Sequence, residues 1–132
     1  MSEQLPGLGD LVLAAHDRAL QFGGRDGIRD LHSIESAIAR PYSGYYRSIA
    51  EKAAAIVHSL ALNHGFIDGN KRTALYMMAL LLERSGYRLQ PRPSEAYNDD
   101  VEAMIVDVVE HRLDFAGLVD WFRDRILRLP QR

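Results

Sequence analysis

The chain has no cysteine, no long apolar run and no excess of positive charge, and each lack excludes a class of protein. Without cysteine there is no disulfide framework and no thiolate metal site, which suits a reducing compartment. The longest unbroken apolar run, residues 74–82, is far shorter than the ~20 residues that span a bilayer. The formal net charge of −2 argues against a dedicated nucleic-acid binder. Since the first ten residues lack a secretory signal pattern, we expect a cytoplasmic protein that contacts neither membrane nor nucleic acid.

Hydrophobic spacing predicts a single domain over residues 1–132, folded as an all-α bundle of about six helices. A chain of 132 residues with 47% hydrophobic content has enough apolar surface for one core. From Ser48 to Asn63, apolar residues recur three and four positions apart, which places them on one helical face. The segment Thr73–Ser85 is apolar nearly all round and predicts a helix at the centre of the bundle. We expect this helix to begin near Asn70 and to end at Gly86.

Capping and turn residues predict where the other helices begin and end. The expected N-cap residues are Asp10, Ser33, Asn98 or Asp99, and Asp114. The expected ends are Phe22, the residue before Pro41, and Pro130, with Ile126 and Leu129 inside the last helix. Residues 23–30 are expected to form a glycine-rich loop, and residues 89–94 to be extended. Strands are expected at most in the tyrosine-rich segment 42–47, for which an irregular flap is the alternative.

The densest group of reactive side chains lies between two predicted helices, at His64-Gly65-Phe66-Ile67-Asp68-Gly69-Asn70-Lys71-Arg72. A helix that begins near Asn70 presents free backbone N–H groups and the positive end of its dipole to the loop, which forms an anion site. Lys71 and Arg72 add full charges to that site, and Asp68 supplies a hard oxygen ligand of the kind that Mg²⁺ prefers. His64 can take a proton from an attacking hydroxyl group.

Each of these residues also has an ordinary structural explanation when it is taken alone. Asp68-Gly69 is a common turn signal, Asn70 is a common helix cap, and charged pairs often lie on a solvated face. Phe66, between polar neighbours, is expected to turn into the core and to anchor the loop. The concentration of base, carboxylate and cations within nine residues favours a site for phosphoryl or nucleotidyl transfer.

The pattern His64-x-Phe66-x-Asp68-x-Asn70-Lys71-Arg72, followed by Thr73-Ala74-Leu75, resembles the signature of the Doc (death-on-curing) toxins in the Fic superfamily. The likeness covers most of the chain, since it includes Leu13–Gly24 with His16-Asp17 and Gly23-Gly24, Glu35–Pro41, and Gly86-Tyr87. The resemblance implies a helical Fic fold with the motif at its centre.

The resemblance also implies a role for each residue of the motif. His64 is then the general base, Asp68 holds Mg²⁺, and Gly69, Asn70, Lys71 and Arg72 bind the phosphates of ATP. Fic enzymes that transfer AMP carry glycine where this chain has Lys71, whereas lysine is typical of Doc toxins. The Doc-like residue implies a reversed nucleotide and transfer of the γ-phosphate to a threonine of elongation factor Tu, which stops translation.

Control by a partner is a further implication of the resemblance. Many Fic proteins inhibit themselves through a pattern Ser/Thr-x-x-x-Glu, but no serine or threonine here is followed four residues later by glutamate. Doc toxins depend instead on a small Phd-like antitoxin, whose tail packs across an apolar groove of the toxin. The tyrosines Tyr42, Tyr45 and Tyr46 lie where the target-docking flap of the family falls, although packing against the bundle explains them equally well.

Four other interpretations compete with a γ-phosphate transferase. A metal-dependent HD phosphohydrolase would use His16-Asp17 together with His58, His64 and Asp68, but no histidine lies upstream of the dipeptide. A P-loop needs glycine where Asn70 stands and serine or threonine where Arg72 stands. Transfer of AMP to a protein hydroxyl stays open as an alternative. A Fic-fold protein that binds nucleotide or partner without turnover also stays open, although the intact His64 argues against it.

Overall fold

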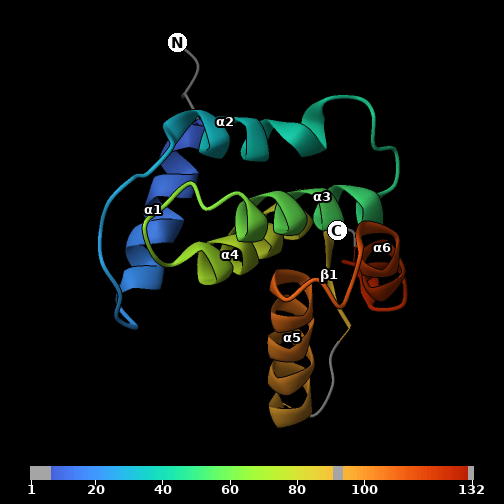
Figure 1. The fold of residues 1–132 in the computed structure, drawn as a ribbon. Helices are drawn as coiled ribbons and strands as arrows, with labels where there is room; N and C mark the ends of the chain where they lie inside the picture. Colours follow the sequence, from blue (N-terminus) through green and yellow to red (C-terminus); the bar gives the residue numbers. More distant parts are fainter. Residues whose placement is uncertain (1–6, 91–93, 131–132) are drawn as a thin grey trace.

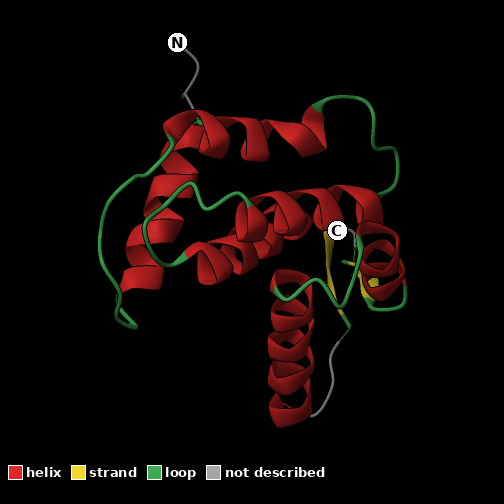
Figure 2. Ribbon diagram, in the orientation of Figure 1, coloured by secondary structure: helices red, strands yellow, loops and turns green. Residues whose placement is uncertain are grey.

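The computed structural model describes residues 7–90 and 94–130, and helices make up most of these residues (Figures 1 and 2). The described elements are α1 (Leu8–Leu20), α2 (Leu31–Ala39), the short 3₁₀ helix η1 (Arg40–Tyr42), α3 (Ile49–Leu62), α4 (Asn70–Arg84), β1 (Tyr87–Leu89), α5 (Ser94–Val109), α6 (Phe115–Arg123) and β2 (Ile126–Arg128). The expected all-α class with about six helices is confirmed. None of the described helices is both long and apolar enough to cross a membrane.

The centre of the bundle is α3, which packs against α2, η1, α4, α5 and α6. Its start is fixed locally by a capping box in which the Ser48 hydroxyl accepts from the Glu51 N–H and the Glu51 carboxylate accepts from the Ser48 N–H, both at 3.1 Å. Residues 53–57 are all buried, and the small alanines among them let neighbouring helices approach from several sides. Figure 1 shows α3 lying between α2 and α4.

The helix over residues 73–85 was predicted to occupy the centre of the bundle, and this prediction is wrong because α3 lies there. One side of α4 is buried, through residues such as Met77 and Leu81, and packs on α3 and α1. Ala79, Glu83 and Arg84 lie on its exposed side. An apolar surface all round therefore does not place this helix at the centre, because its C-terminal half borders an open groove and its outer side faces solvent.

The boundaries of α1, α2 and α5 differ from the predicted ones. α1 begins at Leu8 after Gly7, so that Asp10 lies inside its first turn, and it ends at Leu20. α2 is capped by the Asp30 carboxylate, which accepts from the Ser33 N–H at 3.2 Å, so Ser33 is the donor rather than the cap. α5 begins at Ser94, before Asn98 and Asp99. The remaining predicted cap, Asp114, is confirmed, since its carboxylate accepts from the Gly117 N–H at 2.8 Å.

A small antiparallel sheet replaces the predicted end of the last helix. α6 stops at Arg123, and Ile126 pairs with Leu89 in the β1–β2 ladder. The backbone then returns to the end of α4, where the Leu129 N–H donates to the Gly86 carbonyl at 2.8 Å. The helical spacing of Ile126 and Leu129 was misleading, because the edge of β1 offers hydrogen bonds that a local pattern does not reveal. The segment 42–47 contains no strand, and of the segment 89–94 the residues 91–93 lie outside the described part.

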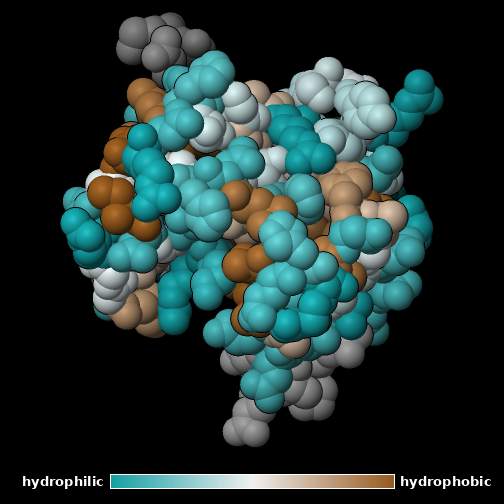
Figure 3. All heavy atoms as spheres, viewed as in Figure 1, coloured by the Kyte–Doolittle hydropathy of each residue, from teal (hydrophilic) through white to brown (hydrophobic). Residues whose placement is uncertain are grey.

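The face of the molecule in Figure 3 is mostly hydrophilic, with separate hydrophobic patches rather than one continuous apolar surface. The large hydrophobic residues that are exposed in the described part are Leu13, Phe22, Ile28, Leu31, Tyr42, Tyr45 and Leu127. They are spread over α1, α2, η1, β2 and the loops after α1 and η1. Single exposed residues of this kind are normal on a protein surface, so each needs its own local argument.

Candidate active site

Residues 64–69 of the motif form the turn between α3 and α4, residues 70–72 begin α4, and two residues with positive φ lie at the two ends of the turn. His64 has a φ of 51° and Gly69 a φ of 81°. Phe66 between them is 1% exposed, and its backbone forms an isolated bridge with Ile28 in the loop that precedes α2. The turn is thus attached to the core by one aromatic side chain, while its polar residues remain at the surface.

The amide of Asn70 closes the turn. Its Oδ1 accepts from the Phe66 N–H at 3.1 Å, and its Nδ2 donates to the Phe66 carbonyl at 3.0 Å. Both ends of the amide are therefore engaged within the turn. The Asn70 side chain therefore holds the shape of the turn, while its backbone N–H lies at the start of α4.

The start of α4 leaves backbone donors available beside the turn. Along this helix, the Thr73 N–H is the first to reach a backbone acceptor, the Gly69 carbonyl, at 3.0 Å. The N–H groups of residues 70–72 precede it at the positive end of the helix dipole. Lys71 and Arg72 are exposed in the same turn. The partial positive charges of these backbone N–H groups and the full charges of the two side chains therefore lie together at one place on the surface.

His16 on α1 contacts the buried side of the turn, a role that the sequence did not reveal. Its ring is 3% exposed and stacks on Phe66 with a centroid distance of 3.7 Å and an interplanar angle of 9°. Its Nε2 lies 2.7 Å from the Asp68 carbonyl oxygen. Since a carbonyl only accepts, Nε2 carries the proton of this hydrogen bond. His16 is thus buried and bonded to the turn, although it lies on α1 and outside the motif.

The glycine-rich loop after α1 fixes the carboxylate of Asp68. The Arg25 N–H donates to Asp68 Oδ2 at 2.9 Å. Gly24 approaches so closely that a Cβ there would lie 3.2 Å from the Asp68 Cβ. The sequence identified Gly23 and Gly24 as the end of a helix, as the start of a loop and as part of the family resemblance, but their spacing to the motif carried no signal of this contact.

Three small hollows surround the motif, with volumes of about 170, 190 and 140 Å³. Lys71 lines all three of them. The first hollow reaches the glycine-rich loop, the second reaches His64, and the third lies against α5. The other residues that line the first hollow are Ala19, Gly23, Gly24, Asp68, Gly69, Asn70 and Arg72. Those that line the second are Ala61, Ile67, Asp68, Gly69, Asn70 and Val109. Those that line the third are Arg72, Leu75, Glu102, Ile105 and Val106.

The structure thus brings the predicted site residues together around Lys71. His64 shares a hollow with Asp68 and Lys71, and Arg72 extends along the other two. The guanidinium carbon of Arg72 lies 4.1 Å from the ring centroid of Phe22, a residue that the sequence did not single out. A base, a carboxylate and an anion cradle in adjoining hollows can position a polyphosphate next to an attacking hydroxyl.

A second group with metal-type ligands consists of His16, Asp17 and Asp26, whose ligand atoms lie within 4.8 Å of one another. Asp26 was not expected to join the dipeptide His16-Asp17. Both carboxylates are exposed, and Nε2 of His16 is engaged with the Asp68 carbonyl. His58 lies elsewhere, on α3, where its Nδ1 is 3.5 Å from Arg40. The residues that an HD phosphohydrolase would combine are therefore not brought together in one centre.

The tyrosine-rich segment lies at the other end of α3 from the motif (Figure 1). Tyr46 packs on Phe115 and accepts a hydrogen bond from Arg40 Nε at 2.6 Å. Tyr42 is 52% exposed and Tyr45 is 81% exposed. Tyr46 therefore packs against the bundle, whereas Tyr42 and Tyr45 are exposed and available to a partner.

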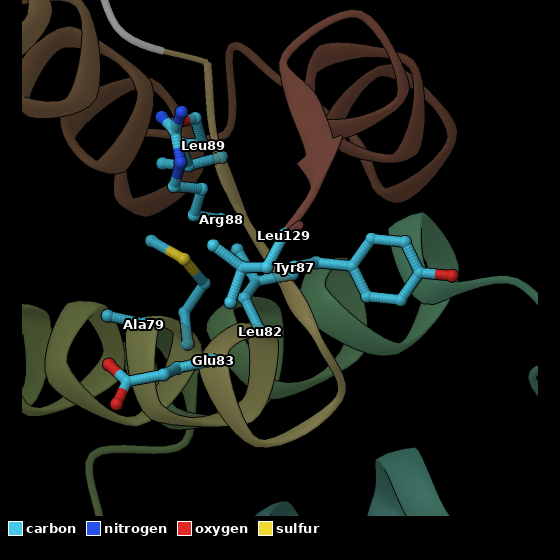
Figure 4. Close-up of a pocket in the computed structure, with 8 residues that line it drawn as sticks. Ala79, Leu82, Glu83, Tyr87, Arg88, Leu89 and Leu129 are labelled. Atoms are coloured by element: carbon cyan, nitrogen blue, oxygen red, sulfur yellow. The ribbon is translucent and has the colours of Figure 1, made fainter. Parts of the chain in front are cut away.

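A hollow of about 430 Å³, larger than the three at the motif, lies away from them at the C-terminal half of α4. Figure 4 shows side chains of α4 and β1 converging on it, together with Leu129 from beyond β2. It is lined by Met78, Ala79, Leu82, Glu83, Tyr87, Arg88, Leu89 and Leu129. Most of these side chains are apolar, so the hollow is a groove for apolar side chains rather than for phosphates.

Comparison with known proteins adds two findings. Residues 9–82, which run from α1 into α4 and include the whole motif, match the family model described as Fic/DOC family. The chain is also 40% identical over 76 residues to a protein named Toxin Doc from Mycolicibacterium smegmatis (strain ATCC 700084 / mc(2)155). This match covers 54% of the chain and 58% of the relative, so the chain spans little more than half the length of that protein.

Proposed function

The chain belongs to the Fic/DOC family, and we propose from that premise that it is a Doc-like toxin which transfers the γ-phosphate of ATP to a hydroxyl group of a protein. The relative from Mycolicibacterium smegmatis is named a toxin, and the proposal extends that property to this chain. The proposed acceptor is a threonine of elongation factor Tu, whose modification would block translation in the cytoplasm. The proposed partner that restrains the toxin is a Phd-like antitoxin.

The observation that carries this proposal is that His64 and Lys71 line the same hollow, with Asp68, Gly69 and Asn70 between them. Phosphoryl transfer needs little covalent chemistry from the protein and depends on position and charge. Here a group that can accept a proton lies beside groups that can bind phosphate oxygens. A site for binding alone would not require the imidazole in that hollow.

The proposed reaction assigns a separate task to each group. His64 takes the proton of the target hydroxyl, whose oxygen attacks the γ-phosphorus of ATP. The bond from that phosphorus to the bridging oxygen breaks, and ADP leaves with the electron pair. Lys71, Arg72 and the backbone N–H groups at the start of α4 stabilise the negative charge that develops on the phosphate oxygens.

Asp68 would hold the magnesium ion that accompanies ATP in this family. Its side chain is exposed beside the cationic turn, and the Arg25 N–H engages only Oδ2. A carboxylate oxygen thus remains for a hard cation, which typically takes one or two carboxylates together with phosphates and water. When bound, the cation would neutralise charge on the phosphates.

Labelling at two positions of ATP tests the proposal. The protein is incubated with a bacterial lysate and with ATP labelled either at the α- or at the γ-phosphorus. Label from the γ position alone on one protein band is expected, and growth arrest on expression is expected with it. Label from the α position would mean AMP transfer, and label from neither position would contradict the enzymatic function.

Two histidine variants make the test specific. Replacing His64→Ala should lower transfer by roughly 10²- to 10⁴-fold, the usual contribution of a general base, and should abolish growth arrest. The matched control is His32→Ala, which removes another exposed histidine, on α2. Transfer that survives in His64→Ala at the parental rate would show that the proposed base is wrong.

A further inference from the structure

Phe22 is an exposed aromatic residue at the rim of the first hollow. It lies in the turn after α1, where its N–H donates to the Ala19 carbonyl at 3.2 Å. Its side chain is 63% exposed, more than any other large hydrophobic residue of the described part except Tyr45. The two residues that follow it, Gly23 and Gly24, line the hollow together with Asp68 and Lys71.

One face of the Phe22 ring is covered by Arg72, whose guanidinium carbon lies 4.1 Å from the ring centroid. Among the described residues, no carboxylate forms an ion pair with Arg72. The guanidinium is therefore held at this place by a cation–π contact, which is weak at an exposed site. A phosphate group would attract it more strongly, since charge-assisted hydrogen bonds to phosphate are short and strong.

The first hollow suits phosphates better than a purine base. Its walls are formed by Ala19, glycines, Asp68, Asn70 and the cations Lys71 and Arg72, with no aromatic side chain on which a base could stack. A nucleotide whose phosphates occupy it must place its base on the surface beside it. Among the described residues, Phe22 is the exposed aromatic residue next to this hollow, since Tyr42 and Tyr45 precede α3 in the chain whereas the motif follows it.

We propose that Phe22 is the platform on which the adenine base of ATP stacks, and that Arg72 covers this platform until phosphate binds. Arg72 then turns toward the phosphate oxygens and uncovers the aromatic face, so that the two halves of the nucleotide bind together. The proposal rests on the proposed function, because it concerns the same nucleotide. It adds a residue that recognises the base, whereas the motif accounts only for the phosphates.

Binding of ATP and of inorganic tripolyphosphate, each with Mg²⁺, separates base stacking from phosphate binding. Dissociation constants are measured by calorimetry for the parent protein, Phe22→Ala, Phe22→Trp and the control Leu13→Ala, which removes an exposed apolar side chain from the middle of α1. Phe22→Ala should weaken ATP by about tenfold to a hundredfold without weakening tripolyphosphate. Phe22→Trp should bind ATP at least as well as the parent, because its ring is larger.

Three results would overturn the inference. Unchanged ATP affinity in Phe22→Ala would show that the ring does not contact the base. Equal weakening of ATP and tripolyphosphate would show that Phe22 acts only by holding Arg72. Failure of the parent protein to bind either ligand would refute the proposed function itself, and the platform with it, which distinguishes this result from a failure at Phe22 alone. Because the side chain is exposed, thermal melting should show Phe22→Ala as folded as the control.

Discussion

Adding one methyl group at Gly24 should displace Asp68. The substitution should therefore lower the rate of phosphate transfer by more than its effect on folding explains. Gly24 has a φ of +111°, and a Cβ at this position would lie 3.2 Å from the Asp68 Cβ and 3.5 Å from a Leu20 methyl carbon. The matched control is Gly86→Ala at the other end of α4. Gly86 has a φ of +88°, but a Cβ there would meet no atom within 4 Å.

The two substitutions share one cost and differ in another. Each forces a side chain into a backbone conformation that favours glycine, which costs about 1–3 kcal/mol of stability. Only Gly24→Ala adds a contact that is a few tenths of an ångström tighter than the ~3.5 Å at which carbon atoms meet comfortably. Asp68 is held by His16 at its carbonyl and by Arg25 at its carboxylate, so it cannot yield without loosening one of these hydrogen bonds.

The expected effect on catalysis follows from the sensitivity of transfer to position, since a displacement of about 1 Å can cost 10²-fold in rate. A shift of a few tenths of an ångström should therefore lower the rate of γ-phosphate transfer by roughly tenfold. Urea unfolding gives the stability of both variants, and the initial rate of label transfer per folded molecule gives their activity. The reasoning is refuted if Gly24→Ala and Gly86→Ala are equally stable and transfer phosphate at the same rate.

Two further substitutions test the supports of the site and of the bundle. Asn70→Asp keeps the size of the side chain but replaces the Nδ2 that donates to the Phe66 carbonyl by an oxygen. The free energy of unfolding, measured with urea at neutral pH, should fall by about 1–3 kcal/mol. Parental stability would contradict the role of the Asn70 amide in holding the turn. The pKa of His58 is lowered, first by burial and then by the charges of Arg40 and His111. As the pH falls below about 6.5, His58 therefore takes up a proton in the unfolded chain before it does so in the folded chain. The contribution of His58 to stability is complete above that pH and is lost as the pH falls through the lowered pKa of the folded state. Unfolding curves between about pH 5 and 8 should show a smaller decline in His58→Gln, and an equal decline would exclude His58 as the cause.

The parts of the fold that the sequence predicted are those fixed by local chemistry. The helix predicted over residues 48–63 from its apolar spacing is α3, which the structure shows to begin at a capping box within four residues, and the predicted cap Asp114 accepts from the third residue after it. The errors lie where distant segments decide. The pairing of Ile126 with Leu89 joins segments far apart in the sequence, and no periodicity within either segment could predict it.

The candidate site shows the same division. The motif is contiguous, so its polar groups could be identified together and the start of α4 at Asn70 could be predicted from Gly69 before it. The groups that position Asp68 come from α1 and the loop after it. His16 is 52 residues away in sequence from the carbonyl that it binds, and Arg25 is 43 residues away from the carboxylate. A single sequence contains no signal for such contacts.

The origin of these contacts has a consequence for how the site is assembled. His64 follows α3, and Lys71 and Arg72 belong to α4, so the rigid packing of these two helices fixes the base relative to the cations. The carboxylate is fixed differently, because its hydrogen bonds come from α1 and from the glycine-rich loop. The position of Asp68 relative to His64 thus depends on the packing of α1 against α4. A catalytic group held by neighbours with locked geometry is preorganised, and here His16 provides that lock, since it is at once buried, stacked on Phe66 and bonded to the Asp68 backbone.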